Sequence, residues 1–362
     1  MKKEARKKII YIVESFSGGV YQIIKDLSNH LIEEYDIIIA YGKREQTPKN
    51  FKKEFDSRIQ WREIVNFTKN ISLYKDIRAM KEINNLIKNE RPDIIHLHSS
   101  KAGAIGRLIN TSNIKICYTP HGFSFFKKDV SVLKRKTYWC IEKFLAIMCK
   151  KCTIIACSDS EYKEAVKLGK KVKLINNGIE IEKLKNNFKE IEKHKIDWDK
   201  IKICTVGRID YSKNPRQFNE IAKEFPEIEF KWIGDGDLKL KKMLLSKNII
   251  ITGWLSNKDV FKEINKSDIF ILTSSWEGMP VSLLEAMYCR KTCVVSNVVG
   301  NRDVIENGKN GYIANDSNEF KEIIKDVIQQ KRQTTIDKAY SDVVTKYNIV
   351  NMVKKYKQIY EE

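Results

Sequence analysis

The sequence contains no apolar run of about eighteen residues, so it predicts no membrane-spanning helix. Residues 1–8 are basic, but the apolar run Ile9–Val13 behind them is too short for the hydrophobic region of a secretion signal. Six prolines and no low-complexity stretch in 362 residues argue against a disordered or fibrous chain. With 42% apolar residues, the chain is long enough for two globular domains, each with its own core.

Metal-binding patterns are also scarce. His96-Leu97-His98 has no carboxylate beside it, which favours structural support or acceptor contact over a metal. Among eight cysteines, Cys149 and Cys152 have redox or metal spacing, but no second such pair completes a four-ligand site. We therefore expect no metal and no cofactor. We expect reduced structural thiols and a cytoplasmic location.

Acidic residues are under-represented in the first half of the chain, which carries most of the net charge of +20. Residues 1–200 hold 41 Lys and Arg against 25 Asp and Glu. Such a surface suits nucleic acid, anionic lipid or phosphorylated substrates, and a general lysine bias is the alternative explanation. Residues 123–151 combine basic and aromatic side chains on expected helices. They predict contact with an anionic membrane, or else ordinary helices with a solvated face.

Short apolar strands alternate with helical stretches along the chain, which predicts an α/β fold of two doubly wound parallel sheets. In the first half, the expected strands are Ile9–Val13, Asp36–Ala40, Asp93–Leu97, Lys115–Thr119 and Thr153–Cys157. Helical stretches such as Val20–Leu31 separate them. In the second half, they are Lys202–Val206, Glu229–Ile233, Asn248–Thr252, Asp268–Leu272 and Lys291–Ser296. The predicted organisation is a domain over 1–180, a charged connection over 181–200, a second domain over 201–345 and a helix over 346–362 that packs back towards the first domain.

Polar residues follow several strands of the second domain. Gly207-Arg208 and Lys213 offer a guanidinium and an ammonium that can clamp a diphosphate. Gly234 and Gly253 open turns where backbone can approach a ligand closely. After the strand that ends at Leu272, a helix start marked by Pro280 lies between Glu277 and Glu285. A helix N-terminus there can receive a phosphate, and the two carboxylates can accept hydrogen bonds from hydroxyls.

Together these motifs, including Gly234-Asp235-Gly236 and Glu277-Gly278-x-Pro280 with Glu285, resemble the C-terminal half of a family 4 retaining glycosyltransferase. The resemblance implies the GT-B architecture, in which two Rossmann-like domains face a cleft. One departure concerns Val299-Gly300-Asn301-Arg302-Asp303, where many family members have Gly-Gly followed by Glu. This form resembles a subgroup of bacterial surface-polysaccharide transferases.

The resemblance also implies roles for residues of the second domain. Arg208 and Lys213 would hold the donor diphosphate, Glu285 the ribose hydroxyls and Glu277 the donor sugar near the reacting centre. Further phosphate contacts would come from backbone amides, namely those of Met279, Val281, Ser282 and Leu283.

In the first domain, Gly18-Gly19 resembles the family's glycine-rich loop, which approaches the donor phosphate or the acceptor. His121, in Pro120-His121-Gly122, matches the histidine that lies over the donor sugar. His98 and Lys101 are weaker candidates for acceptor contact or structural support.

The sequence therefore predicts a metal-independent, retaining transfer of a hexosyl or N-acetylhexosaminyl group from a UDP-sugar. The acceptor would be a saccharide or a lipid-linked saccharide of bacterial surface polysaccharide synthesis, and the enzyme would contact the inner face of the plasma membrane without binding nucleic acid. Two alternatives stay open. One is a non-hydrolysing UDP-sugar epimerase on the same fold, and the other is a non-catalytic polyanion-binding protein.

Overall fold

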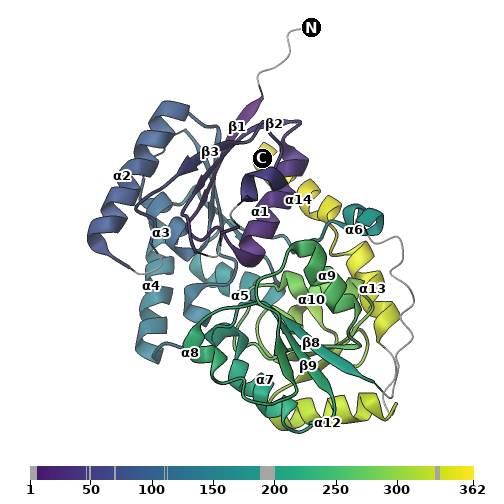
Figure 1. Ribbon diagram of the computed structural model, residues 1–362. Helices are drawn as coiled ribbons and strands as arrows, with labels where there is room; N and C mark the ends of the chain where they lie inside the picture. The colour runs from purple at the N-terminus through teal and green to yellow at the C-terminus, as the bar shows by residue number, and fades with distance from the viewer. Residues whose placement is uncertain are drawn as a thin grey trace. The chain divides into compact units, whose positions relative to one another are not determined.

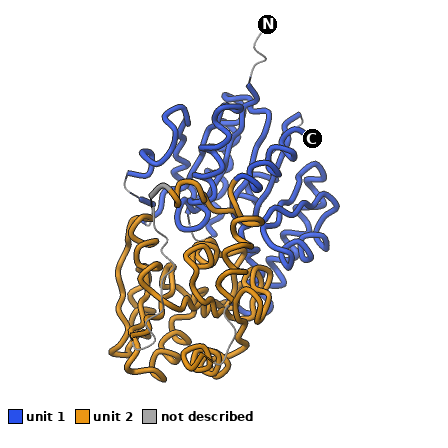
Figure 2. Tube along the Cα trace, turned by 90° about the vertical axis from the view of Figure 1, so that its right-hand side faces the viewer, with its two compact units in different colours: residues 1–126, 130–176, 350–362 blue, residues 127–129, 177–349 orange. Residues whose placement is uncertain are grey.

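The computed structural model describes residues 6–45, 47–48, 50–68, 71–109, 111, 113–187, 200–330 and 335–362. Contacts within the chain divide it into two compact units (Figure 2). Unit 1 comprises residues 1–126, 130–176 and 350–362, and unit 2 comprises residues 127–129 and 177–349. Most of the expected charged connection, residues 188–199, lies outside the described residues.

Unit 1 is built on a seven-stranded parallel sheet with the order β3-β2-β1-β4-β5-β6-β7. Its strands are β1 Lys7–Val13, β2 Tyr35–Tyr41, β3 Gln60–Glu63, β4 Ile94–His98, β5 Lys115–Thr119, β6 Thr153–Ala156 and β7 Val172–Leu174. Runs of isoleucine and valine are buried on both faces of the central strands, as a parallel sheet covered by helices requires.

Helices cover both faces of this sheet (Figure 1). They are α1 Gly18–Leu31, α2 Leu73–Glu90, α3 Ser100–Leu108, α4 Val132–Met148, α5 Asp159–Leu168 and, from the end of the chain, α14 Ile349–Glu361, with short 3₁₀ turns η1 Phe51–Glu54 and η2 Ser124–Phe126. Alternate residues of β1 divide between two cores. Ile10 and Ile12 join a cluster with Ala79 and Ile83 of α2, whereas Tyr11 lies within hydrogen-bonding distance of Tyr360 of α14.

Unit 2 contains a six-stranded sheet, again parallel, with the order β10-β9-β8-β11-β12-β13. Its strands are β8 Lys202–Val206, β9 Glu229–Ile233, β10 Ile249–Ile251, β11 Ile269–Leu272, β12 Thr292–Ser296 and β13 Tyr312–Ala314. The two sheets confirm the predicted doubly wound α/β class.

The helices of unit 2 are α6 Ile181–Asn187, α7 Pro215–Ala222, α8 Leu238–Lys241, α9 Asn257–Asn265, α10 Val281–Tyr288, α11 Asn301–Val304, α12 Ser317–Ile328 and α13 Ile336–Thr345, with the 3₁₀ turn η3 Tyr211–Lys213. One core cluster joins Phe218 of α7 and Phe320 of α12 to Trp232 of β9. Helix α6 occupies the start of the segment that the sequence suggested was only a connection. Ile181 and Leu184 bury one side of this short helix, and the role of the segment as a connection stays a prediction.

In each sheet the strand order reverses at one point. In unit 2, β8 and β11 are neighbours although β9 and β10 lie between them in the chain. In unit 1, β1 and β4 are neighbours in the same way. Loops after two such strands diverge to opposite faces of the sheet and leave a crevice at its carboxyl edge, where ligands bind in open α/β sheets. None of the described helices combines the length and the apolar character that a membrane crossing requires.

Candidate active site

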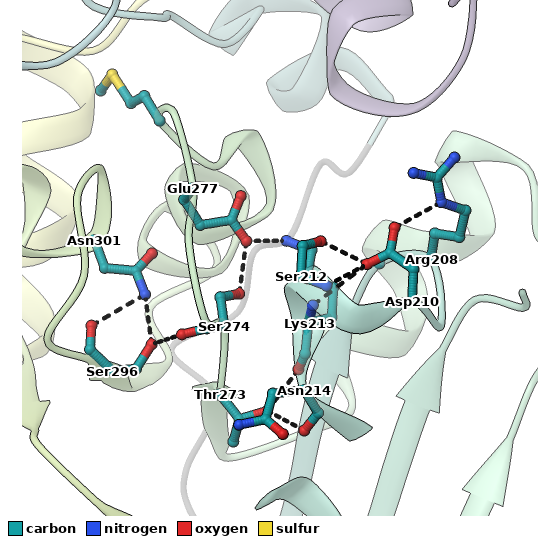
Figure 3. Close-up of polar contacts among 12 residues, drawn as sticks. Arg208, Asp210, Ser212, Lys213, Asn214, Thr273, Ser274, Glu277, Ser296 and Asn301 are labelled. Carbon is teal, nitrogen blue, oxygen red and sulfur yellow. Dashed lines mark hydrogen bonds and ion pairs between the residues drawn. The ribbon is translucent and has the colours of Figure 1, made fainter. Parts of the chain in front are cut away.

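The loops at the carboxyl ends of β8 and β11 carry Arg208, Lys213 and Glu277, three of the charged residues that the sequence singled out in unit 2 (Figure 3). Lys213, in the loop after β8, donates from Nζ to Oε1 of Glu277 over 2.6 Å, and Glu277 follows β11. The two side chains are 15% and 13% exposed. Because burial makes an unpaired charge costly, the partly buried ammonium and carboxylate hold one another in this loop pair.

Ser274 adds a second hydrogen bond to the same carboxylate oxygen, with its hydroxyl donating to Oε1 of Glu277 over 2.6 Å. The loops after β8 and β11 are also joined through backbone, since the Ser275 amide donates to the Ser212 carbonyl over 2.7 Å. Among the described residues, Oε2 of Glu277 has no hydrogen-bond partner. One carboxylate oxygen is therefore fixed by the protein, and the other can accept a hydrogen bond from a hydroxyl.

Arg208 is held by Asp210, whose Oδ2 accepts a 2.8 Å hydrogen bond from Nε of Arg208. The other oxygen of Asp210 accepts from the amide and hydroxyl of Ser212 and so starts η3. Burial favours the protonated acid, but Arg208, Ser212 and Lys213 outweigh it and hold the pKa of Asp210 below its usual value. No partner is found for the terminal nitrogens of Arg208 in the described part of the chain, and a bidentate fork remains for an anion.

Helix α10 follows Glu277 and begins at Val281, with Pro280 as its N-cap. The amides of Val281 and Ser282 stand in its first turn, where no intrahelical acceptor exists. The Leu283 amide donates to the Pro280 carbonyl over 3.2 Å, so it is not the open donor that the sequence suggested. Glu285 lies one turn further along α10 and is partly exposed.

Asn177 fixes the segment before α10, a role that the sequence analysis did not predict. Its side-chain amide donates to the Met279 carbonyl over 2.9 Å, and its backbone amide lies 3.2 Å from Sδ of Met279. Both residues are buried. Met279 is therefore held by a residue about a hundred positions away, and the only local signal was the Asn-Asn-Gly turn at 176–178.

The segment 299–303, which departs from the common family pattern, supports the loop that carries Glu277. Ser296 donates to the Ser274 carbonyl over 2.5 Å, and the Asn301 amide donates to the Ser296 hydroxyl over 3.1 Å. Gly300 has φ +84°, and a Cβ at this position would collide with the Gly278 carbonyl oxygen. Gly300 thus allows a close approach of two backbones beside Glu277.

Two further glycines close the strand ends of β9 and β10. Gly234 has φ +140°, and a Cβ there would collide with the carbonyl oxygen of Gly207. Gly253, with φ +75°, forms an isolated bridge with Gly234. Gly234 therefore lets the ends of β8 and β9 pack closely, whereas a Cβ at Gly253 would meet no atom closer than 4.0 Å, so the requirement for glycine there is its positive φ.

In unit 1, the residues singled out also follow strands β1, β4 and β5. Gly18 and Gly19 begin α1, and Gly18 has φ +58° with open space where a Cβ would be. Nδ1 of His98, at the end of β4, lies 2.9 Å from Nε2 of His121, and the two rings stack 5.2 Å apart. Lys101 pairs with Asp76 over 2.7 Å, so its ammonium is engaged in support of the fold.

Burial keeps this group of histidines neutral. It lowers the pKa of His121 to about 4. Burial, and then the neighbouring imidazoles, lower the pKa of His96 and of His98 well below the usual value. His96 is fixed between Tyr360, at 2.7 Å, and Thr119, at 2.8 Å. His121 is therefore a neutral hydrogen-bonding group near pH 7, and its φ of +53° is imposed by the turn into Gly122.

No group of three or more His, Cys, Asp or Glu side chains within the described ranges could hold a metal ion. The expectation of a metal-independent enzyme stays a prediction.

Comparison with known proteins shows the family of this chain. Residues 17–183 match the family described as Glycosyltransferase Family 4, and residues 186–342 match Glycosyl transferases group 1. An Escherichia coli enzyme named UDP-Gal:alpha-D-GlcNAc-diphosphoundecaprenol alpha-1,3-galactosyltransferase is 33% identical over 321 residues, which are 81% of each chain. The chain belongs to glycosyltransferase family 4.

Two further similarities extend over nearly the whole of this glycosyltransferase. A Klebsiella pneumoniae protein named for its place in the cps region is 30% identical over 98% of this chain and 99% of its own. The solved structure of HepE from Anabaena, in complex with UDP and glucose, has a TM-score of 0.77. It is 16% identical and covers 99% of this chain and 100% of that one. This similarity confirms the predicted GT-B fold.

The close approach at Gly300 generates a first prediction. Gly300→Ala should weaken binding of the nucleotide donor about tenfold, because its Cβ would displace the backbone of Gly278 beside Glu277. Gly308→Ala is the matched control, with φ +77° and nothing within 4 Å of the added atom. Both changes carry backbone strain of about 1–2 kcal/mol. Isothermal titration with UDP measures the difference, and equal affinities in the two variants would contradict the assignment.

The neutral histidines predict a pH dependence of stability. Below about pH 6.5 the unfolded chain protonates its histidines while folded His121 stays neutral down to about pH 4. The unfolded state then binds more protons, so the free energy of unfolding falls as the pH decreases through this window. His121→Asn, which suits the positive φ, should reduce this slope by up to about 1.4 kcal/mol per pH unit near pH 5.

Urea unfolding between pH 4.5 and 8 checks this prediction. The slopes of the two proteins should coincide above pH 7, where His121 is neutral in both states. A variant that follows the wild-type curve throughout the acid range would show that His121 is not buried in its neutral form.

Proposed function

We propose that this glycosyltransferase transfers a sugar from a UDP-sugar to a saccharide, free or lipid-linked, in bacterial surface polysaccharide synthesis, with retention at the anomeric carbon. The pairing of Lys213 with Glu277 beside the free guanidinium fork of Arg208 carries this proposal. The arrangement places fixed positive charge next to a carboxylate at the start of α10. A diphosphate and a sugar hydroxyl are the groups that such a pair of charges can hold together.

The relatives support the choice of donor and acceptor. The printed name of the Escherichia coli relative contains a UDP-sugar donor and a diphosphoundecaprenol-linked acceptor, and the Klebsiella relative belongs to a cps region. We therefore favour UDP as the nucleotide and a hexosyl or N-acetylhexosaminyl group as the sugar.

In the proposed step, the bond between the anomeric carbon and the β-phosphate oxygen breaks first. Negative charge develops on the departing diphosphate, where Arg208, Lys213 and the amides of Val281 and Ser282 would stabilise it. The acceptor hydroxyl attacks from the same face and passes its proton to the leaving phosphate oxygen. The new glycosidic bond thus forms with retention at the anomeric carbon. The step accounts for every bond and proton without a covalent enzyme intermediate or a metal ion.

Glu277 and His121 are assigned to the sugar. Oε2 of Glu277 would accept a hydrogen bond from a sugar hydroxyl, since Oε1 is occupied by Lys213 and Ser274. His121 would act as a neutral hydrogen-bonding group to the sugar or the acceptor, as its low pKa excludes a positive charge near pH 7. Glu285 is assigned to the ribose, and Gly18-Gly19 to the donor phosphate or the acceptor.

Family membership favours the transferase over both alternatives raised by the sequence. An epimerase would hold the nucleotide sugar without using a second saccharide, and a polyanion-binding protein would need neither Glu277 nor Glu285.

Variants at the charged pair test the proposal. Glu277→Gln keeps the shape and the acceptor for Ser274 but loses the charge, so transfer should fall about a hundredfold or more while UDP still binds. Lys213→Ala removes a charge-assisted contact of about 1.5–3 kcal/mol, so UDP affinity should fall at least about tenfold. Radiolabelled sugar transfer and titration calorimetry, each with and without EDTA, measure the two effects.

Lys247→Ala, an exposed lysine of the same unit, is the control and should change neither quantity. Wild-type turnover in Glu277→Gln would remove Glu277 from the site. Loss of activity in EDTA would overturn the metal-independent mechanism.

We also propose that α4 rests on an anionic membrane surface. Its side chains Leu133, Phe144, Ile147 and Met148 are 54–76% exposed, and their spacing places them along one side of the helix. Lys134 and Lys136 lie in the first turn and a half of α4. An exposed apolar stripe with basic residues beside it suits the interface of a bilayer that carries anionic lipid, where a lipid-linked acceptor would also lie.

Vesicle flotation tests the α4 surface. Leu133→Ser with Phe144→Ser should lower the fraction bound to phosphatidylglycerol vesicles several-fold, because apolar burial drives insertion into the interface. The exposed pair Met243→Ser and Leu245→Ser in unit 2 is the control. Equal flotation of the wild-type protein with neutral and anionic vesicles would contradict the electrostatic part of this proposal.

A further inference from the structure

A second charged region lies at the amino edge of the unit 1 sheet, the edge opposite to His98 and His121. A cavity of about 710 Å³ opens there between the first residues of β1, β4, β5, β6 and β7 and the end of α14. Figure 1 shows the C-terminal end of α14 in this part of unit 1. Six lysines line the cavity: Lys7, Lys115, Lys151, Lys170, Lys171 and Lys173.

Few of these positive charges are balanced by the protein. The carboxylates in the lining are Asp93, Glu361 and Glu362. Glu362 pairs with Lys173 over 2.8 Å, and Asp93 accepts a hydrogen bond of 2.7 Å from the backbone amide of Lys8.

Four of the lysines remain without a carboxylate within ion-pair distance among the residues that the structure describes: Lys7, Lys115, Lys170 and Lys171. Like charges that converge on one concave surface raise the local potential and attract anions.

The lining also indicates the kind of anion. The volume exceeds that of a single phosphate, and lysine ammonium groups bind phosphate as mobile point charges. Among the described residues that line the cavity, Tyr360 is the only aromatic one, but it is buried and its hydroxyl is engaged by His96. The cavity therefore offers no aromatic face on which a nucleobase could stack, which favours an anion that carries several phosphates and no base.

We propose that this lysine cavity is an accessory binding site for a compound with more than one phosphate group, separate from the donor site of unit 2. Both free oligophosphates and the headgroup of a lipid that carries two phosphates have this chemistry. Lys151 follows the end of α4 by three residues, so the cavity adjoins the helix that carries the exposed apolar stripe.

The test uses the full chain and the charge-removing pair Lys170→Gln with Lys171→Gln. Binding of inorganic tripolyphosphate is measured by calorimetry at constant ionic strength, with UDP present to occupy the donor site. The pair should weaken this binding about tenfold or more. Lys223→Gln with Lys247→Gln removes the same charge from exposed positions in unit 2 and should change it less than about twofold.

Two further measurements distinguish a lipid ligand from a soluble one, and the lysine cavity from the donor site of unit 2. Flotation is measured with phosphatidylcholine vesicles, with and without cardiolipin. It shows whether the increase in the vesicle-bound fraction that cardiolipin causes depends on Lys170 and Lys171. Lys213→Ala should leave tripolyphosphate binding unchanged, so a failure of the proposed donor site does not affect this result.

Lysine-dependent binding of tripolyphosphate supports a soluble ligand, and a lysine-dependent cardiolipin increment supports a lipid headgroup. If neither depends on Lys170 and Lys171, or if both charge-removing pairs act equally, the site is overturned.

Discussion

The ion pair between Lys213 and Glu277 is the interaction on which the site of unit 2 depends. It joins residues 64 positions apart, from loops after two adjacent strands whose connections run to opposite faces of the sheet. Because a partly buried charge is costly when unpaired, the pair keeps both loops in one arrangement before a ligand arrives. Ser274 then donates to Glu277 itself, Ser296 donates to the Ser274 carbonyl, and Asp210 holds Arg208.

This arrangement explains why glycine is needed in particular places and not throughout. At Gly300 the backbone runs against Gly278, and at Gly234 it runs against Gly207. A side chain at position 300 would displace the segment that carries Glu277, and one at position 234 would displace the segment that carries Arg208. Gly308 has a similar φ but open space around it, so its requirement is conformational alone.

The two units contribute different electrostatics to the proposed transfer. Unit 2 supplies fixed charges, which can respond to a departing diphosphate. Unit 1 supplies neutral histidines in a chain of contacts from Tyr360 to His121, of which His96 and His98 are buried and His121 is partly exposed. In the proposed transfer, a neutral imidazole would not compete with Arg208 and Lys213 for the negative charge that develops on the phosphate. Part of the lysine excess of the first half of the chain lies elsewhere, at the amino edge of the sheet and along α4.

The local sequence determined the apolar strands, the α/β rhythm and the spacing of Glu277 and Glu285, because these follow from patterns within a few residues. Prediction of secondary structure from the sequence failed where a pattern was short or polar. Edge strand β3, Gln60–Glu63, is mostly exposed and has no apolar alternation, and α6 buries a single side within a charged stretch.

Only the tertiary structure decided that Asn177 holds Met279, that Asn301 supports the Ser274 loop through Ser296, and that Leu283 is not an open donor. The first two contacts join distant segments, and the last depends on how α10 begins. Strand order and loop geometry set them, and neither is encoded in local periodicity.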